Sequence, residues 1–113
     1  MTEEKDCIFC KIARKEIKVQ VIVESDNFLA FPDAHPKIKG HTLIISKKHF
    51  VNLVDMPAVL GNELLDMVKK VGLGYKQDFN VVVNTGQEAG QVIMHFHLHV
   101  LPRKKGDGFR MAV

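Results

Sequence analysis

The sequence predicts a single α+β domain over residues 1–113, with a five-stranded, largely antiparallel sheet, a short N-terminal helix and one long central helix. Three observations support this fold class. A chain of 113 residues is long enough for one hydrophobic core and too short for two. Hydrophobic residues make up 46% and charged residues 26%, the balance of an ordinary globular protein. The local patterns run in the order helix, three strands, helix, two strands.

The first half of the chain predicts the short helix and three strands. Residues 6–16 carry apolar side chains on one helical side and basic side chains mostly on the other. Residues 19–24 are rich in β-branched side chains and predict a strand, which a turn joins to a second strand at 28–31. Two prolines and a glycine predict a surface loop at 32–40, and residues 41–46 form the third strand.

The second half predicts the long helix and two further strands. Asp55 precedes a first turn that contains proline, so we expect it to cap this helix. Two glycines are expected to loosen the helix end. Residues 79–84 predict a strand, residues 85–91 a long loop and residues 92–101 the last strand. The apolar positions on one face of the helix are Leu60, Leu64, Met67 or Val68, Val71 and Tyr75.

The composition disfavours several classes of partner. The net charge is +3, and the basic residues are scattered without interleaved aromatic residues, so nucleic-acid binding is not expected. The chain starts with the polar stretch MTEEKD, which is unlike a signal peptide, and no apolar run approaches membrane-spanning length. We therefore expect a cytoplasmic protein with no membrane partner, in which Cys7 and Cys10 form no lasting structural disulfide.

Three of the six histidines alternate with apolar residues in the stretch HFHLHVL, residues 95–101. Because strand side chains point to opposite faces in turn, His95, His97 and His99 would share one face. Three interpretations are open: a solvated strand face, a zinc centre that uses two or three rings, and nucleophilic catalysis. Strict alternation of an uncommon residue disfavours the first. A neutral imidazole suits the third, since the ordinary pKa of histidine is about 6.5.

The cysteine pair in the stretch CIFC also allows three interpretations. A redox motif is one, although the expected βαβ context is missing. Two incidental buried thiols are the second. The third is half of a tetrahedral zinc site, which would need two more ligands from elsewhere in the chain.

Three longer stretches resemble the histidine triad (HIT) superfamily, and its HINT-like nucleotide-binding branch in particular. They are CIFCKIARKEI, FLAFPDAHPKIKGHTLIISKKHF and NTGQEAGQVIMHFHLHVLPR, which together cover nearly the whole chain. The resemblance implies a homodimer whose sheets join across the interface, each subunit binding a purine nucleoside monophosphate or its phosphoramidate. It also implies hydrolysis of a nucleoside 5′-phosphoramidate at the α-phosphorus, through a nucleotidyl-histidine intermediate.

The resemblance assigns roles to individual residues. It makes His97 the nucleophile, and we expect the other ring N–H of this residue to donate to a main-chain carbonyl. His99 would contact the phosphate and help to protonate the leaving group, and His41 would be a further active-site histidine. The remaining implied positions are Ile8, Phe9, Ile12 and Phe31 at the base, Asp33 at the ribose, and Asn84, Gly90, Gln91 and Val92 at the phosphate.

Some of these positions have simpler alternative roles. Core packing is the alternative for the four apolar positions, and turn formation is the alternative for Asp33. Val92 departs from the family, because many HINT-like sequences carry a serine there. Valine cannot donate a side-chain hydrogen bond, so we expect a slower or differently selective phosphoramidase.

The resemblance also implies a structural zinc ion in the variant with a Cys-x-x-Cys pair. Its ligands would be Cys7, Cys10, His49 and His95, and the chemical step would need no metal. The first histidine of the triad would then be structural, the second chemical and the third supportive. Three other functions are left open: a dinucleoside polyphosphate hydrolase, a nucleotide-binding or interaction module with little turnover, and a metal-dependent hydrolase built on the three histidines.

Overall fold

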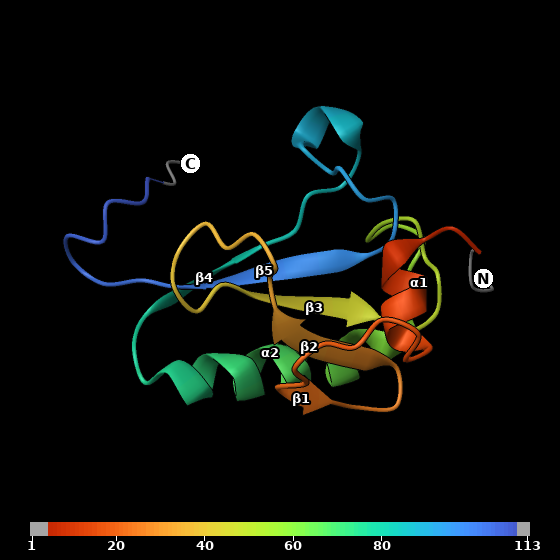
Figure 1. Cartoon of the computed structure of the whole chain (residues 1–113), viewed down its shortest axis with the longest axis horizontal. Coiled ribbons are helices and arrows are strands. Elements are labelled where there is room, and N and C mark those ends of the chain that lie inside the picture. Colours follow the sequence, from red (N-terminus) through yellow and green to blue (C-terminus); the bar gives the residue numbers. More distant parts are fainter. Residues whose placement is uncertain (1–4, 111–113) are drawn as a thin grey trace.

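An antiparallel sheet with the strand order β1-β2-β3-β5-β4 forms the centre of the fold (Figure 1). The computed structural model describes residues 5–110. Its helices are α1 (Ile8–Ala13) and α2 (Gly61–Tyr75), with the 3-10 helices η1 (Ala58–Leu60) and η2 (Gln87–Ala89). Its strands are β1 (Val23–Glu24), β2 (Phe28–Pro32), β3 (Thr42–Ser46), β4 (Phe79–Val82) and β5 (His97–Pro102). The predicted α+β fold class is confirmed.

The two helices cover opposite faces of the sheet. Alternate residues of a strand point to opposite faces, and β2 follows this rule. Its residues Phe28 and Ala30 join the core cluster that contains Met67 and Val71 of α2. The alternate residues Leu29 and Phe31 pack in a second cluster with Phe9 and Ile12 of α1.

Among residues 5–110, no helix has the length and hydrophobicity needed to cross a membrane.

The apolar face predicted for the long helix is confirmed. Met67 and Val71 are buried, and the other predicted positions are partly buried against the same core. The expected cap is wrong, because α2 begins at Gly61 after η1 and has no side-chain cap. Asp55 instead lies in a turn, where its N–H donates to the side chain of Asn52. The two glycines do not end the helix early, since it continues to Tyr75.

Several predicted boundaries are also wrong. The helix predicted at 6–16 ends at Ala13, and the strand predicted at 19–24 pairs only at residues 23–24. The strand predicted at 79–84 ends at Val82. The last strand begins at His97 instead of residue 92, because the chain bends at residues 93–95. Phe96 then bonds through its N–H to the carbonyl of Phe50, outside the regular ladder.

Gly40 determines the backbone conformation of the segment that leads into β3. Its φ of +90° lies in the region that favours glycine, and an added Cβ would lie 2.8 Å from Cγ of Pro102. The hydroxyl of Tyr75 donates to the Gly40 carbonyl at 2.7 Å and so ties this loop to the end of α2. Gly40 therefore allows His41 to enter the sheet in a defined position.

We predict that Gly40→Ala lowers the free energy of unfolding by about 1–3 kcal/mol, the usual cost of a left-handed backbone without glycine. Gly74→Ala is the matched control, since Gly74 is helical and has no atom within 4 Å of an added Cβ. The control should raise stability by about 0.5–1 kcal/mol. Urea unfolding measures both variants. Equal stability of the two variants would contradict the strain assigned to Gly40.

Candidate active site and metal centre

Two groups of ionisable side chains lie along β5. The histidine cluster consists of Asp33, His41, His97 and His99, and the cysteine–histidine cluster consists of Cys7, Cys10, His49 and His95. Strand β5 pairs with β3, which sets His97 opposite Ile45 and His99 opposite Leu43. Figure 1 shows α1 beside the start of β5. The ring of Phe9 in α1 contacts both His95 and His97 there.

The ring of His97 has one nitrogen held by the backbone. Its Nδ1 lies 2.8 Å from the carbonyl oxygen of His95. A carbonyl can only accept, so Nδ1 carries the proton and Nε2 of the neutral ring keeps its lone pair. The side chain is nearly buried at 9% exposure, with the Phe9 ring 5.0 Å away, edge to face. His97 thus has the tautomer that a nucleophilic imidazole needs.

His41 and His99 form a directed hydrogen-bond chain. The backbone N–H of Lys37 donates to Nδ1 of His41 at 3.0 Å. In the neutral ring the proton of His41 is therefore on Nε2, which lies 2.9 Å from Nδ1 of His99. His99 accepts this bond, so its own proton is on Nε2. Oδ2 of Asp33 lies 3.4 Å from the same His41 nitrogen and adds a negative charge to the chain.

Burial is the main cause that lowers the pKa of His99 to about 4; the neighbouring His97 and His41 rings contribute in the same direction, whereas Asp33 opposes the shift. Burial also lowers the pKa of His41, again against the attraction of Asp33. Both rings are therefore neutral at neutral pH. A neutral His99 offers a hydrogen-bond donor, and it would become a proton donor only if a negative charge nearby raised its pKa.

The four donor atoms of the cysteine–histidine cluster all lie within 4.8 Å of one another. Nδ1 of His95 is 3.2 Å from Sγ of Cys7, 3.5 Å from Sγ of Cys10 and 3.1 Å from Nδ1 of His49. Tetrahedral zinc with bonds of about 2.3 Å to sulfur and about 2.0–2.1 Å to nitrogen separates its ligands by roughly 3.3–3.8 Å. The donor types and spacings therefore fit a zinc ion.

The orientation of His95 supports the same conclusion. Its Nε2 lies 2.6 Å from the carbonyl oxygen of Ser46, so Nε2 carries the proton and Nδ1 is left to bind a metal. Burial lowers the pKa of His95 to about 4, although the bond to Ser46 opposes the shift. Protons therefore do not compete for Nδ1 near neutral pH. The backbone N–H of Cys10 donates to Sγ of Cys7 at 3.3 Å, which fits a thiolate ligand.

A second group of possible metal ligands fits a metal ion less well than the cysteine–histidine cluster does. Asp33, His41 and His99 also have ligand atoms within 4.8 Å of one another. However, Nδ1 of His41 accepts the Lys37 N–H, so Nε2 must keep its proton and cannot ligate through its lone pair. The three alternate histidines are thus divided: His95 belongs with the cysteines, and the other two belong to a hydrogen-bonded site. This division disfavours a metal centre built on all three.

The apolar residues assigned to the base are mostly in the core. Phe9 and Ile12 of α1 and Phe31 of β2 are buried in one hydrophobic cluster, so each contributes to core packing. Ile8 is 46% exposed on the same helix. The rings of Phe9 and Phe31 meet edge to face with centroids 6.2 Å apart. These residues can therefore form one apolar wall beside His97.

The loop before β5 is held by a buried side chain. Gln91 is 3% exposed, and its Oε1 accepts the N–H of Gly86 at 2.8 Å while its Nε2 donates to the carbonyl of Val51 at 2.6 Å. Its main-chain N–H also bonds within the loop, to the Gly86 carbonyl. Gly90 has a left-handed φ of +99° and lies beside Asn84. Val92 is 87% exposed at the end of this loop.

Three of these contacts had no signal in the sequence: the Lys37 N–H to His41, the Ser46 carbonyl to His95 and the structural role of the Gln91 side chain. All three use backbone groups as partners, which nearly every residue has. His35 is exposed and takes part only through its N–H, which donates to Oδ1 of Asp33 at 3.0 Å. That bond helps to orient the carboxylate.

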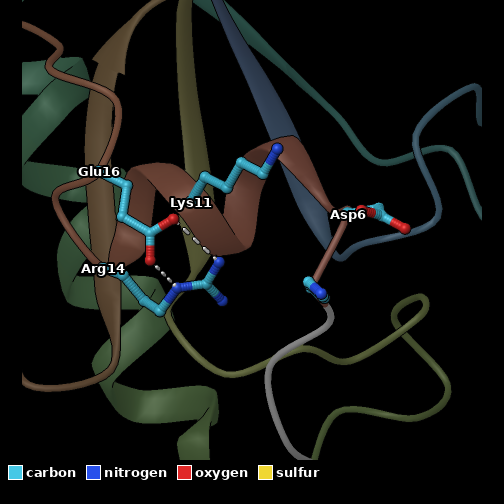
Figure 2. Close-up of a pocket in the computed structure, with 5 residues that line it drawn as sticks. Asp6, Lys11, Arg14 and Glu16 are labelled. Carbon is cyan, nitrogen blue, oxygen red and sulfur yellow. Dashed lines mark hydrogen bonds and ion pairs between the residues drawn. The ribbon is translucent and has the colours of Figure 1, made fainter.

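A charged hollow of about 530 Å³ lies beside α1, and its lining includes no member of either cluster (Figure 2). Figure 2 shows Arg14 and Glu16 pointing toward one another, and their ion pair measures 2.5 Å. Lys5, Asp6 and Lys11 complete the lining, so charges of both signs are present. Its lining residues belong to neither group of possible metal ligands among residues 5–110, and the Arg14–Glu16 pair occupies part of the lining, so we assign no function to the hollow.

Comparison with known proteins adds to this geometry. A sequence model of the HIT domain matches residues 14–106. An uncharacterized HIT-like protein of Methanocaldococcus jannaschii is 42% identical over 110 residues, which cover 90% of this chain and 82% of that protein. The adenylylsulfatase HINT3 of Arabidopsis thaliana is 37% identical over 111 residues, which cover 94% of this chain and 56% of that protein.

Solved structures show the same fold. A histidine triad protein from Clostridium difficile is 35% identical with a TM-score of 0.84, and the match covers 96% of this chain and 100% of that chain. A HIT family hydrolase from Legionella pneumophila is 35% identical with a TM-score of 0.79, and the match covers 88% and 95% of the two chains.

For the metal centre, we predict about one zinc ion per chain in protein purified without a histidine tag. Cys10→Ser should lose most of the metal, because it removes a buried ligand. His35→Ala, which replaces an exposed histidine outside the cluster, should keep it. Elemental analysis by mass spectrometry measures all three proteins. A metal-free wild type with both thiols open to titration would contradict the assignment.

Proposed function

This chain belongs to the HIT domain family, and on that premise we propose that it is a nucleoside 5′-phosphoramidate hydrolase that acts on AMP-type substrates. The observation that carries the proposal is the ring of His97, held by the His95 carbonyl with its Nε2 lone pair available. Such a ring can attack phosphorus without a metal ion in the chemical step. The name of the adenylylsulfatase relative, which denotes a nucleotide hydrolase, supports the same class of chemistry.

The proposed reaction has two displacements. Nε2 of His97 forms a bond to the α-phosphorus, the P–N bond breaks, and the amine leaves with a proton. Water then attacks the nucleotidyl-histidine, and the nucleoside monophosphate and free imidazole are released. We assign the first proton to His99, whose pKa is low in the free protein and would rise beside a negatively charged phosphate. His41 acts through His99, by holding its Nδ1 in a hydrogen bond.

Binding of the nucleotide follows from the surrounding residues. We assign the base to the wall of Ile8, Phe9, Ile12 and Phe31, where apolar side chains offer stacking with little readout of base edges. We assign the ribose hydroxyls to Asp33, whose carboxylate has lone pairs beyond its bond to the His35 N–H. The positions assigned to the phosphate are Asn84, Gly90, Gln91 and Val92, with His97 and His99.

The proposal includes a structural zinc ion at the cysteine–histidine cluster and a homodimer of single-domain chains, residues 1–113. Zinc would join the N-terminal helix to the sheet and add its binding energy to folding. The homodimer is supported by strand β4, which lies at the edge of the sheet. Its residues Phe79 and Val81 are 37% and 43% exposed, and an exposed apolar edge is a site for pairing with another chain.

The test of the proposed chemistry is intact mass spectrometry after acid quench. Wild type mixed with an adenosine phosphoramidate should gain the mass of one nucleotidyl group, and His97→Ala should not. A parallel incubation with diadenosine polyphosphates separates the alternative hydrolase, since faster release of nucleotide from these substrates would favour it. Binding of AMP without turnover of either substrate would favour a nucleotide-binding module and overturn the proposal.

A second test concerns Val92, which is exposed at the end of the phosphate loop. Val92→Ser should raise kcat/KM on phosphoramidates by about 2- to 10-fold, because one neutral hydrogen bond contributes about 0.5–1.5 kcal/mol. Val92→Thr adds the same hydroxyl at nearly constant shape, and Val92→Ala removes bulk without adding a donor. Steady-state kinetics with several amine leaving groups measure the effect. Unchanged kinetics in the serine variant would refute a role for this position.

A further inference from the structure

His95 connects the two clusters through different atoms of one residue. Its ring presents Nδ1 to the cysteine–histidine cluster, at 3.2 Å from Sγ of Cys7. Its carbonyl oxygen accepts the hydrogen bond that sets the tautomer of His97. The residue is fully buried at 0% exposure, and Ser46 holds the far side of its ring. A ligand that fixes the His95 ring would therefore also restrict the residue whose backbone carbonyl orients His97.

Phe9 makes a second connection from the other side. It lies between the two cysteines in sequence, in the first turn of α1, and it is 4% exposed. Its ring packs edge to face against His95 at 5.7 Å and against His97 at 5.0 Å. The two cysteines therefore hold the turn of helix that presses an aromatic ring onto the proposed nucleophile.

Helix α1 needs such an anchor. It has six residues, and a helix of this length is unstable in isolation. Cys7 caps it through a bond from the Cys10 N–H to Sγ, so the cysteines are part of its first turn. Zinc at the cluster would hold this turn against His49 and His95. Loss of zinc would remove these constraints on the first turn, and any ordering of α1 then left to nucleotide binding would cost conformational entropy.

We propose that zinc binding at the cysteine–histidine cluster and nucleotide binding at His97 strengthen each other, with His95 and Phe9 as positioning residues shared by both sites. This inference rests on the proposed nucleotide site. Coupling between two binding sites is reciprocal: whatever factor zinc contributes to nucleotide affinity, the nucleotide contributes to zinc affinity. Typical couplings lie between about 5- and 150-fold, and the direct contacts here place the expected effect within that range.

The first experiment measures AMP affinity by calorimetry for zinc-loaded and zinc-depleted wild type. AMP should bind the zinc-loaded protein at least about fivefold more tightly. The second measures the rate of zinc transfer from loaded protein to an excess of a chromophoric chelator, with and without saturating AMP. AMP should slow this transfer, and the measurement starts from folded protein even if the zinc-depleted form loses structure.

Two matched variants test the role of Phe9. Phe9→Leu keeps all four metal ligands but removes the ring that contacts both imidazoles, so AMP should slow zinc transfer much less than in wild type. Phe31→Leu shortens a neighbouring ring in the same apolar cluster and leaves the contacts of Phe9 with the histidines in place. It should weaken AMP binding while keeping the effect of AMP on zinc transfer.

The outcomes separate this inference from the proposed function. Equal AMP affinity with and without zinc, together with zinc transfer that AMP does not slow, would overturn the coupling and leave the hydrolase proposal standing. Failure of AMP to bind either form would overturn the nucleotide site itself and the coupling with it. A full AMP effect in Phe9→Leu would remove Phe9 from the shared positioning role.

Discussion

The hydrogen bond between Nδ1 of His97 and the carbonyl oxygen of His95 is the interaction on which the site depends. It is local in sequence, yet it requires the chain to bend at residues 93–95 before the strand begins. That bend turns the His95 ring toward the cysteines and its carbonyl toward the next histidine. One backbone feature thus separates the ring that faces the cysteines from the ring of the proposed nucleophile.

Burial lowers the pKa of His41, His95 and His99, and backbone partners decide which nitrogen of a neutral ring keeps its lone pair. The neutral forms of His95 and His99 are favoured because desolvation penalises the charged imidazolium. A neutral imidazole has one donor nitrogen and one acceptor nitrogen, so a single backbone bond decides which nitrogen faces the site. The Ser46 carbonyl fixes the tautomer of His95, and the His95 carbonyl fixes that of His97. The N–H of Lys37 fixes the tautomer of His41.

Periodicity was enough to predict the fold class, because the apolar positions of α2 and the alternation in β2 reflect real buried faces. It could not predict where strands end, since the bend before His97 and the bond of Phe96 to Phe50 depend on distant segments. The hydrogen bond from Nδ1 of His97 to a main-chain carbonyl was expected, because a nucleophilic imidazole needs its other nitrogen protonated and held. The metal-binding set of four came only with the family resemblance, because the pattern of residues left several interpretations of the cysteines open.

The contacts of the N-terminal helix with the end of the chain have a consequence for synthesis. Cys7 and His95 are separated by 88 positions, and the partner of Cys10 in the middle of the chain, His49, is 39 positions away. A ribosome exposes the cysteines first, but the histidine that completes their environment emerges among the last residues of the domain. Long-range contacts of this kind have a high loop-closure entropy cost and slow the folding of a domain. Until the last strand arrives, the thiols lack the His95 side of this environment, so they are more open to oxidants on the nascent chain than in the folded domain.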